Sequence, residues 1–275
     1  MKLFKNLVWL LITLAFLQGC GKEAEKQGKN AQSSKVIKLG INGDENVVWE
    51  NVRDILAKEN IELKFVNFAD YIRPNLALQE KEIDLNAFQT EIYFDNFKKE
   101  HNLTIEKLGY TLLAPMGIYS KKVTDISQVK DGGTVAIPND SANGGRALLL
   151  LQDAGFILLN EGVGALPRVK DISENKKNIK IVELTATQIP RSIQDVDAAV
   201  INNGVAVQAG YSPLKDSIFI EDPKQERMKL YFNLIASRAD NRELPEIKRL
   251  VEVYQSPENR KIIEDYYKGS SIPAF

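Results

Sequence analysis

The chain has 275 residues, and its 36 Lys and Arg against 37 Asp and Glu give a formal net charge of −1. This balance lacks the basic excess of a nucleic-acid-binding protein, and 44% hydrophobic with 27% charged residues argues against a disordered chain or a multi-span membrane protein. A single Cys and a single His argue against disulfide frameworks, zinc sites and His-based triads, so we expect neither a metal nor a cofactor.

Residues 1–19 have the layout of a secretory signal peptide. Two lysines precede the apolar run Leu7–Leu17, which is shorter than the about 20 residues that a membrane-spanning helix needs. The following Leu17-Gln18-Gly19-Cys20 resembles the bacterial lipobox and predicts that Cys20 is lipidated; an ordinary signal peptide with an isolated cysteine is the alternative. Residues 20–35 are polar and predict a flexible tether. We therefore expect a lipid-anchored protein on the extracytoplasmic face of the cell membrane.

Strand and helix patterns alternate from Val36 onward. Apolar alternation predicts strands and i, i+3, i+4 spacing predicts helices, with Pro favoured in a helix's first turn. In chain order the first series is a strand Val36–Ile41, a helix Val48–Leu56, a strand Ile61–Phe68, a helix from Pro74 to about Gln79, and an extended segment Ile83–Phe88. This order is typical of a parallel α/β sheet.

A second α/β series and a helical C-terminal region follow. The predicted elements are strands at Leu112–Tyr119, Thr134–Ile137, Ile179–Leu184, Ala198–Asn202 and Tyr231–Ser237, and helices near Gly145–Asp153, Pro245–Tyr254 and Pro257–Lys268, the last closed by Gly269. The pattern predicts an α/β fold of two units, which by itself does not define a function.

The sequence offers little support for an enzyme. It contains no G-x-S-x-G, G-x-x-x-x-G-K-[ST] or H-E-x-x-H motif, and His101 lies in a charged helix end where we expect a solvated surface residue. Carboxylate pairs occur, but none lies in an apolar segment that would raise a pKa for acid catalysis. We expect a binding protein rather than an enzyme.

Arg146 is the first candidate for ligand contact. A predicted strand ends at Pro138, three good N-cap residues follow it as Asn139–Ser141, and an apolar helix comes next. A helix N-terminus favours anions, and Arg146, which we place in the first turn, adds a planar donor suited to a carboxylate. The alternative is a surface arginine bonded to a neighbouring loop.

Further candidates lie at predicted strand ends. Tyr71, Phe88 and Tyr93 are aromatic residues near the end of a strand, although such residues are commonly part of a core. Asn202, followed by Asn203, ends an apolar run where α/β sheets place ligand-binding groups. Asn233 lies within a predicted buried strand, where its amide needs a partner from either the protein or a ligand.

Together these stretches resemble the methionine-binding lipoproteins of ABC importers, the NlpA lipoprotein family. The resemblance extends in the same order from about Val36 to the C-terminus, and the lipobox also occurs in the expected place. Its segments are Asp70–Leu78, Asp84–Gln89, Ile118–Lys122, Ala136–Asp140, Gly145–Gln152, Pro190–Ser192, Ala199–Asn203 and Phe232–Ile235.

The resemblance implies a two-lobed periplasmic-binding-protein fold of type II, with two crossovers between the lobes and a ligand site in the cleft. It places the first lobe at residues 36–114 and 231–275 and the second at residues 115–230. By the same resemblance Arg146 binds the ligand carboxylate, Asn202 and Asn233 hold the amino-acid head group, and Tyr71, Phe88 and Tyr93 line the side-chain pocket. The implied partners are an amino acid, L-methionine first, and the permease and ATPase of an ABC importer, with the binding protein itself a monomer.

Two positions depart from the family pattern. Thr90 stands where the family usually has a histidine, and Val205 where it usually has a tyrosine. Thr90 removes a ring from the expected site, so a methionine-containing dipeptide or another apolar amino acid stays open as the ligand. A lipid-anchored interaction protein or adhesin that keeps the fold without the ligand is the alternative function.

Overall fold

The computed structural model describes residues 35–43 and 47–275. The predicted signal peptide, Cys20 and residues 20–34 of the predicted tether lie outside the described residues. None of the helices in the described ranges is long and apolar enough to cross a membrane.

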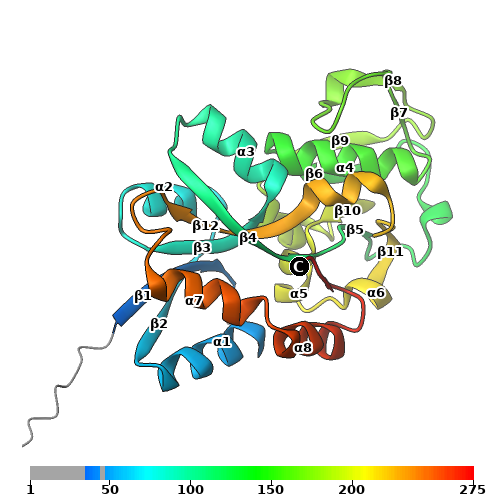
Figure 1. Cartoon of the computed structure of the whole chain (residues 1–275). Helices are drawn as coiled ribbons and strands as arrows, with labels where there is room; N and C mark the ends of the chain where they lie inside the picture. Colours follow the sequence, from blue (N-terminus) through cyan, green and yellow to red (C-terminus); the bar gives the residue numbers. More distant parts are fainter. Residues whose placement is uncertain (1–34, 44–46) are drawn as a thin grey trace, which may run out of the picture. The chain divides into compact units, whose positions relative to one another are not determined.

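The first lobe is built on a six-stranded mixed sheet (Figure 1). Its strands, in the order β13-β4-β12-β3-β1-β2, are β1 (Lys35–Asn42), β2 (Ile61–Phe68), β3 (Leu85–Thr90), β4 (Ile105–Leu113), β12 (Phe232–Arg238) and β13 (Ile272–Pro273). Strands β2 and β3 pair in parallel with β1, whereas β12 and β4 pair antiparallel. The parallel pairing predicted for the three strands of the first series is therefore confirmed, and the later strands join this sheet in the antiparallel direction.

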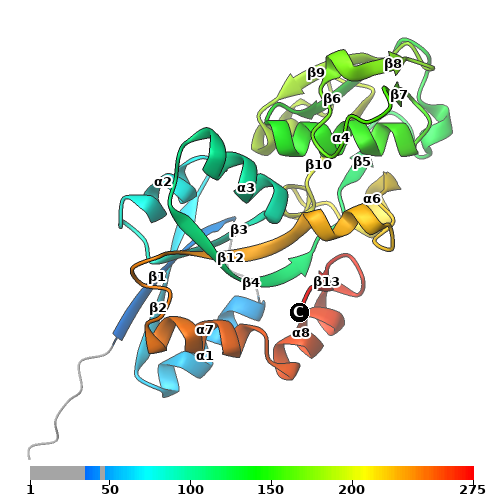
Figure 2. The ribbon, with the colours of Figure 1, turned by 45° about the horizontal axis from the view of Figure 1, so that its top comes forward.

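Helices cover both faces of this sheet. They are α1 (Val47–Lys58), α2 (Arg73–Gln79), α3 (Glu91–Glu100), α7 (Pro245–Tyr254) and α8 (Pro257–Tyr267). One face packs against α1, α7 and α8 through a core that includes Leu39, Val52 and Leu250, and the other packs against α2 and α3 around Leu78 and Phe94. Figure 2 shows α1 beside α7 below the sheet and α2 with α3 above it.

The second lobe has a five-stranded sheet of order β11-β5-β10-β6-β9. Its strands are β5 (Gly117–Tyr119), β6 (Thr134–Pro138), β9 (Lys180–Leu184), β10 (Ala198–Ile201) and β11 (Ser217–Ile220), and a separate pair is β7 (Leu158–Leu159) with β8 (Ile172–Glu174). Its helices are α4 (Ser141–Asp153), α5 (Asn203–Gln208) and α6 (Pro213–Asp216). Short 3-10 turns are η1 (Ile126–Gln128), η2 (Val169–Asp171), η3 (Ala186–Ser192) and η4 (Glu226–Tyr231).

The chain passes between the two sheets twice. It leaves the first sheet after β4 and enters the second at β5, and it returns from β11 through η4 to β12. The prediction of one strand over Leu112–Tyr119 is therefore wrong, because residues 114–116 separate two strands of different sheets. Pro115, which has no N–H to donate to a ladder, lies in this crossover.

Most predicted helices and strands agree with the structure. Ile61–Phe68 and Pro245–Tyr254 have the predicted bounds. The helix predicted near Gly145 begins earlier, at Ser141, because the Asp140 side chain caps it by accepting from the Asn143 N–H. Arg146 consequently lies in the second turn of α4 rather than in the first.

Asp197 joins three segments at one end of the central strands β5, β10 and β6 of the second sheet. Its carboxylate accepts from the Thr134 N–H at 2.8 Å and lies 3.2 and 3.4 Å from the ammonium groups of Lys122 and Lys130. Its backbone carbonyl accepts from the Ser120 hydroxyl at 2.8 Å. The Thr134 N–H, followed by Lys122, holds the pKa of Asp197 below its ordinary value.

A carboxylate with a lowered folded-state pKa stabilises the fold above its unfolded pKa of about 3.9 and loses that contribution as pH falls through its folded pKa. We expect Asp197→Asn to lower the free energy of unfolding at neutral pH by about 1 kcal/mol, since the amide still accepts from Thr134 but carries no charge. The difference from the wild type should shrink toward about pH 3. Urea unfolding at both pH values measures it.

The matched control is Asp195→Asn, because this exposed carboxylate lies two residues away and makes no ion pair within the described residues. If the loss in free energy of unfolding caused by Asp197→Asn stayed constant with pH, the charge of Asp197 would not contribute to stability.

Candidate ligand-binding site

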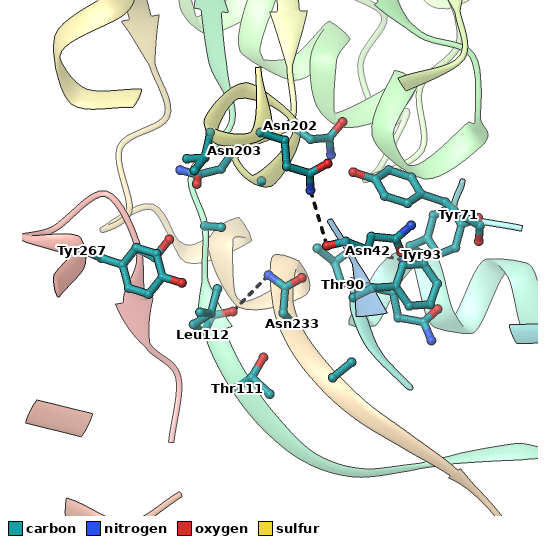
Figure 3. A pocket seen from close by; sticks show the side chains of 18 of the residues that line it. Asn42, Tyr71, Thr90, Tyr93, Thr111, Leu112, Asn202, Asn203, Asn233 and Tyr267 are labelled. Carbon is teal, nitrogen blue, oxygen red and sulfur yellow. Dashed lines mark hydrogen bonds between the residues drawn. The ribbon is translucent and has the colours of Figure 1, made fainter. Parts of the chain in front are cut away.

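One cavity of about 440 Å³ gathers the predicted site residues (Figure 3). All seven line it: Tyr71, Phe88, Thr90, Tyr93, Arg146, Asn202 and Asn233. They come from both lobes, because Thr90 ends β3, Asn233 lies in β12, Arg146 lies in α4 and Asn202 follows β10. The cavity therefore lies between the two sheets, at the ends of their strands.

Three aromatic rings form one end of the cavity. The rings of Tyr71, Phe88 and Tyr93 lie 5.8 to 6.1 Å apart between centroids, and the Tyr93 hydroxyl donates to the Tyr71 carbonyl at 2.8 Å. Ala142 of the second lobe packs against the same cluster. This end is thus an apolar pocket closed by both lobes, as suits an aliphatic or thioether side chain.

Thr90 has a structural role at this end. It is the N-cap of α3, where its hydroxyl oxygen accepts from the Tyr93 N–H at 3.4 Å, and it is 8% exposed. Threonine is a good N-cap, so the residue that departs from the family pattern also fits the start of the helix. The cap places Tyr93 in the first turn of α3, facing the cavity.

Buried amides support the wall behind the aromatic rings. The Asn75 side chain exchanges two hydrogen bonds of 2.7 Å with Gln89, and Asn86 donates to Asn75 at 2.9 Å. All three residues are at most 3% exposed, and Gln89 also lines the cavity. Because buried amides are costly when unpaired, this network holds α2 against β3 in one arrangement.

Arg146 is buried rather than a surface residue, being 3% exposed. Its Nε donates to Glu221 Oε1 at 2.8 Å, and one of its terminal nitrogens donates to Glu221 Oε2 at 2.5 Å and to the Ala114 carbonyl at 3.0 Å. The guanidinium carbon lies 4.2 Å from the centre of the Tyr231 ring. The other terminal nitrogen has no hydrogen-bond partner among the described residues, so its two N–H groups are free for a ligand carboxylate.

Asn202 is oriented through a chain of side chains. Its amide nitrogen donates to Asn143 Oδ1 at 2.7 Å, and Asn143 in turn donates to the Asp140 carboxylate from both its backbone and its side chain. Asn202 Oδ1 is buried and has no hydrogen-bond partner within the described part of the chain. Such an acceptor fits a ligand ammonium.

Asp140 also influences the aromatic end. Burial raises the pKa of its carboxyl, and the hydrogen bonds from Asn143 oppose this. Burial and then the charge of Asp140 raise the pKa of both Tyr71 and Tyr93. Both phenols therefore stay neutral near pH 7.

Asn233 lies between the two ends of the cavity (Figure 3). Its amide nitrogen donates to the Leu112 carbonyl at 3.1 Å, which leaves Oδ1 as an acceptor. The protein thus supplies the partner that a polar side chain in this strand needs, and a role of Asn233 in ligand binding stays a prediction.

The cavity continues beyond Asn233 into an aromatic annex. We use this term for the part lined by Trp49, Thr111, Tyr254, Tyr266, Tyr267 and Ser271. Burial raises the pKa of the Tyr267 hydroxyl to about 12. In Figure 3 Tyr267 and Tyr71 lie on opposite sides of Asn233, so the annex and the aromatic pocket extend in different directions from Asn233.

The sequence analysis missed several residues in and around the cavity. Asn42 ends β1 and lines the cavity, and the rule that singled out Asn202 at a strand end would have found it. Asn143 lies in the segment around Arg146, whereas Glu221 carries no local signal, because its partner is 75 residues away. Val205, the second departure from the family pattern, is 5% exposed within an apolar cluster and does not line the cavity.

The two lobes touch beside the cavity. Asn203 of α5 donates to the Ser270 carbonyl at 2.8 Å and to the Pro115 carbonyl at 3.2 Å. Gln208, also of α5, donates to the Asn42 carbonyl at 3.4 Å. These contacts place α5 against both the C-terminal loop and the end of β1.

Comparisons with known proteins agree with the predicted fold and family. Residues 37–275 match the family model described as NlpA lipoprotein. The chain is 41% identical over 269 residues to the D-methionine-binding lipoprotein MetQ of Escherichia coli K12, covering 96% of this chain and 95% of the relative.

Solved structures are also similar to this chain. A nutrient-binding protein from Burkholderia cenocepacia bound to methionine has 41% identity and a TM-score of 0.81, covering 87% of this chain and 100% of that one. The substrate-binding protein of a methionine transporter from Streptococcus pneumoniae has 34% identity and a TM-score of 0.82, covering 87% and 96%. These findings confirm the predicted two-lobed fold and the prediction of a binding protein rather than an enzyme. The chain belongs to the NlpA lipoprotein family.

Proposed function

We propose that this protein is the lipid-anchored substrate-binding protein of an ABC importer, and that it captures an apolar α-amino acid, L-methionine first, in the cavity between its lobes. The lobes comprise residues 36–114 with 231–275 and residues 115–230. Cys20 carries the lipid anchor on the extracytoplasmic side of the membrane. The protein works as a monomer and delivers its ligand to the permease and its ATPase.

The arrangement of charge and amides around Arg146 is the observation that carries this proposal. The free N–H groups of the guanidinium donate to a ligand carboxylate, while the amide oxygens of Asn202 and Asn233 accept from a ligand ammonium. The aromatic rings of Tyr71, Phe88 and Tyr93 then surround the side chain. A zwitterion with an apolar side chain satisfies all three parts, and relatives named for methionine support that choice.

Affinity requires these parts to act together. Micromolar binding corresponds to about 8 kcal/mol. A buried side chain of this size contributes about 1.5–3 kcal/mol, and a charge-assisted hydrogen bond another 1.5–3 kcal/mol. The carboxylate, amine and side-chain contacts are therefore all needed.

The first experiment is mass spectrometry of small molecules released when the purified full chain is denatured. We expect methionine in near-stoichiometric amount. A different amino acid would keep the transport role and change the specificity. An empty protein whose melting temperature no amino acid raises would instead favour the interaction-protein or adhesin alternative.

We expect Arg146→Lys to weaken L-methionine binding by more than about tenfold, since a charge-assisted hydrogen bond of about 1.5–3 kcal/mol is lost. Lysine keeps the charge opposite the buried Glu221, which avoids an unpaired carboxylate, but it lacks the second terminal nitrogen. Isothermal titration calorimetry measures the dissociation constant. Arg168→Lys is the control, because Arg168 is exposed and does not line this cavity. Unchanged affinity of Arg146→Lys would remove the carboxylate assignment.

A methionine-containing dipeptide is a second candidate ligand, favoured by the annex. Pockets for drug-sized ligands span about 300–1,000 Å³, so the cavity of about 440 Å³ has room for more than one small amino acid. The C-terminal methionine would occupy the Arg146 site and the aromatic pocket. Its peptide N–H would donate to Asn233, and the first residue would enter the annex.

We expect Tyr267→Ala to discriminate between the two ligands. If the annex binds the first residue of the dipeptide, this variant weakens the binding of L-alanyl-L-methionine by roughly tenfold, the scale of a lost aromatic contact. The binding of L-methionine stays unchanged. Calorimetry with both compounds on the same preparation measures the ratio. Equal effects on both, or tighter binding of free methionine to the wild type, would restrict the ligand to the amino acid.

A further inference from the structure

Glu221 lies behind Arg146 and accounts for two of its five N–H donors. The carboxylate follows β11, is 2% exposed, and also accepts from the Met116 N–H at 2.6 Å. With the bond to the Ala114 carbonyl, both N–H groups of one terminal nitrogen and the Nε–H of Arg146 are occupied. The remaining terminal nitrogen is thereby the donor left for a ligand.

Arg146 is also the only charged side chain among the described residues that line the cavity. Its partner Glu221 is not part of the lining, and the side chains of the pair are 3% and 1% exposed. Two further acids lie nearby: Asp140, which accepts from Asn143 and raises the pKa of Tyr71 and Tyr93, and Asp153, which is paired with Arg227. Since charges in such a desolvated place interact strongly, a change at Glu221 alters the field that a ligand meets.

We propose that Glu221 sets the charge selectivity of the cavity, so that a zwitterion is bound in preference to a monoanion. This inference rests on the proposed function. Arg146 and Glu221 together have no net charge, so the guanidinium that donates to the ligand carboxylate does not present an uncompensated positive charge to the ligand ammonium, which only neutral amides hold. Without Glu221 the charge of Arg146 repels the ligand ammonium. A ligand that has a carboxylate but no ammonium then gains affinity relative to the zwitterion.

The experiment compares two ligands that differ only in the ammonium group. These are L-methionine and 4-(methylthio)butanoate, and calorimetry gives the ratio of their dissociation constants for each protein. In Glu221→Gln we expect the affinity for 4-(methylthio)butanoate to rise roughly tenfold relative to that for L-methionine, which is the scale of a unit charge in a partly desolvated site. A purely structural loss would weaken both ligands and leave the ratio unchanged.

Two further variants separate charge from shape. Glu221→Asp keeps the charge and changes the length, so its ratio should stay that of the wild type even if both affinities fall. Glu221→Met is neutral and apolar, and it should shift the ratio in the same direction as Glu221→Gln. It serves as the neutral variant if Glu221→Gln does not fold. Glu226→Gln is the control, because this glutamate is exposed and pairs only with Lys229 among the described residues.

The outcomes distinguish this inference from the proposed function. If the wild type binds L-methionine and the neutral variants keep its ratio, the role of Glu221 is wrong and the binding function stands. If Glu221→Asp shifts as far as the neutral variants, shape rather than charge is responsible and the inference is again wrong. A wild type that binds neither compound overturns both.

Discussion

The buried pair of Arg146 and Glu221 is the interaction on which the arrangement of the cavity depends. A charged side chain that is nine-tenths or more buried is costly unless it is paired and hydrogen-bonded, and here each partner makes further bonds to the backbone of residues 114 and 116. Those residues form the crossover from β4 to β5, and Glu221 begins the crossover that leads back to β12. The pair therefore joins α4 to both passages between the lobes.

Its position at the crossovers bears on how binding and lobe movement are coupled. A ligand carboxylate at the free nitrogen of Arg146 meets a group attached to both passages between the sheets. In the proposed binding mode the ligand side chain lies among Tyr71, Phe88 and Tyr93 of the first lobe, which pack against Ala142 of the second. A ligand that makes both contacts binds more tightly when the lobes touch than when they are apart. This difference in affinity is what a ligand-driven closure of the lobes requires.

Much of the fold follows from local patterns, and the rest depends on distant partners. The alternation in Ile61–Phe68 and the proline at the start of Pro245–Tyr254 are sufficient to predict those elements with their bounds. β4 is less regular, with partly exposed residues around Gly109, and its partner β12 lies more than 100 residues along the chain. The antiparallel part of the first sheet and the break at Pro115 come from that long-range pairing.

The candidate site divides in the same way. Asn202 could be found because it follows a strand, and Arg146 because it lies in a helix that starts with a strong cap. The resemblance to the family supplied roles for them and for Asn233. Glu221 could not be found, because nothing around it in the chain indicates a buried ion pair, and only the folded structure brings it to Arg146.

Thr90 shows why a departure from a family pattern need not mean loss of the site. The side chain at this position lies at the start of α3 and lines the cavity. Threonine caps the helix, because its hydroxyl oxygen accepts from the Tyr93 N–H. The three rings nearby still pack against one another, so the apolar pocket persists without the histidine ring. The head-group residues lie on other elements, in α4, after β10 and in β12. Asn233 is the cross-strand partner of Thr90 between β12 and β3, whereas Arg146 and Asn202 lie in the second lobe. The departure at residue 90 therefore bears on the aromatic end of the cavity and on Asn233, and not directly on Arg146 or Asn202.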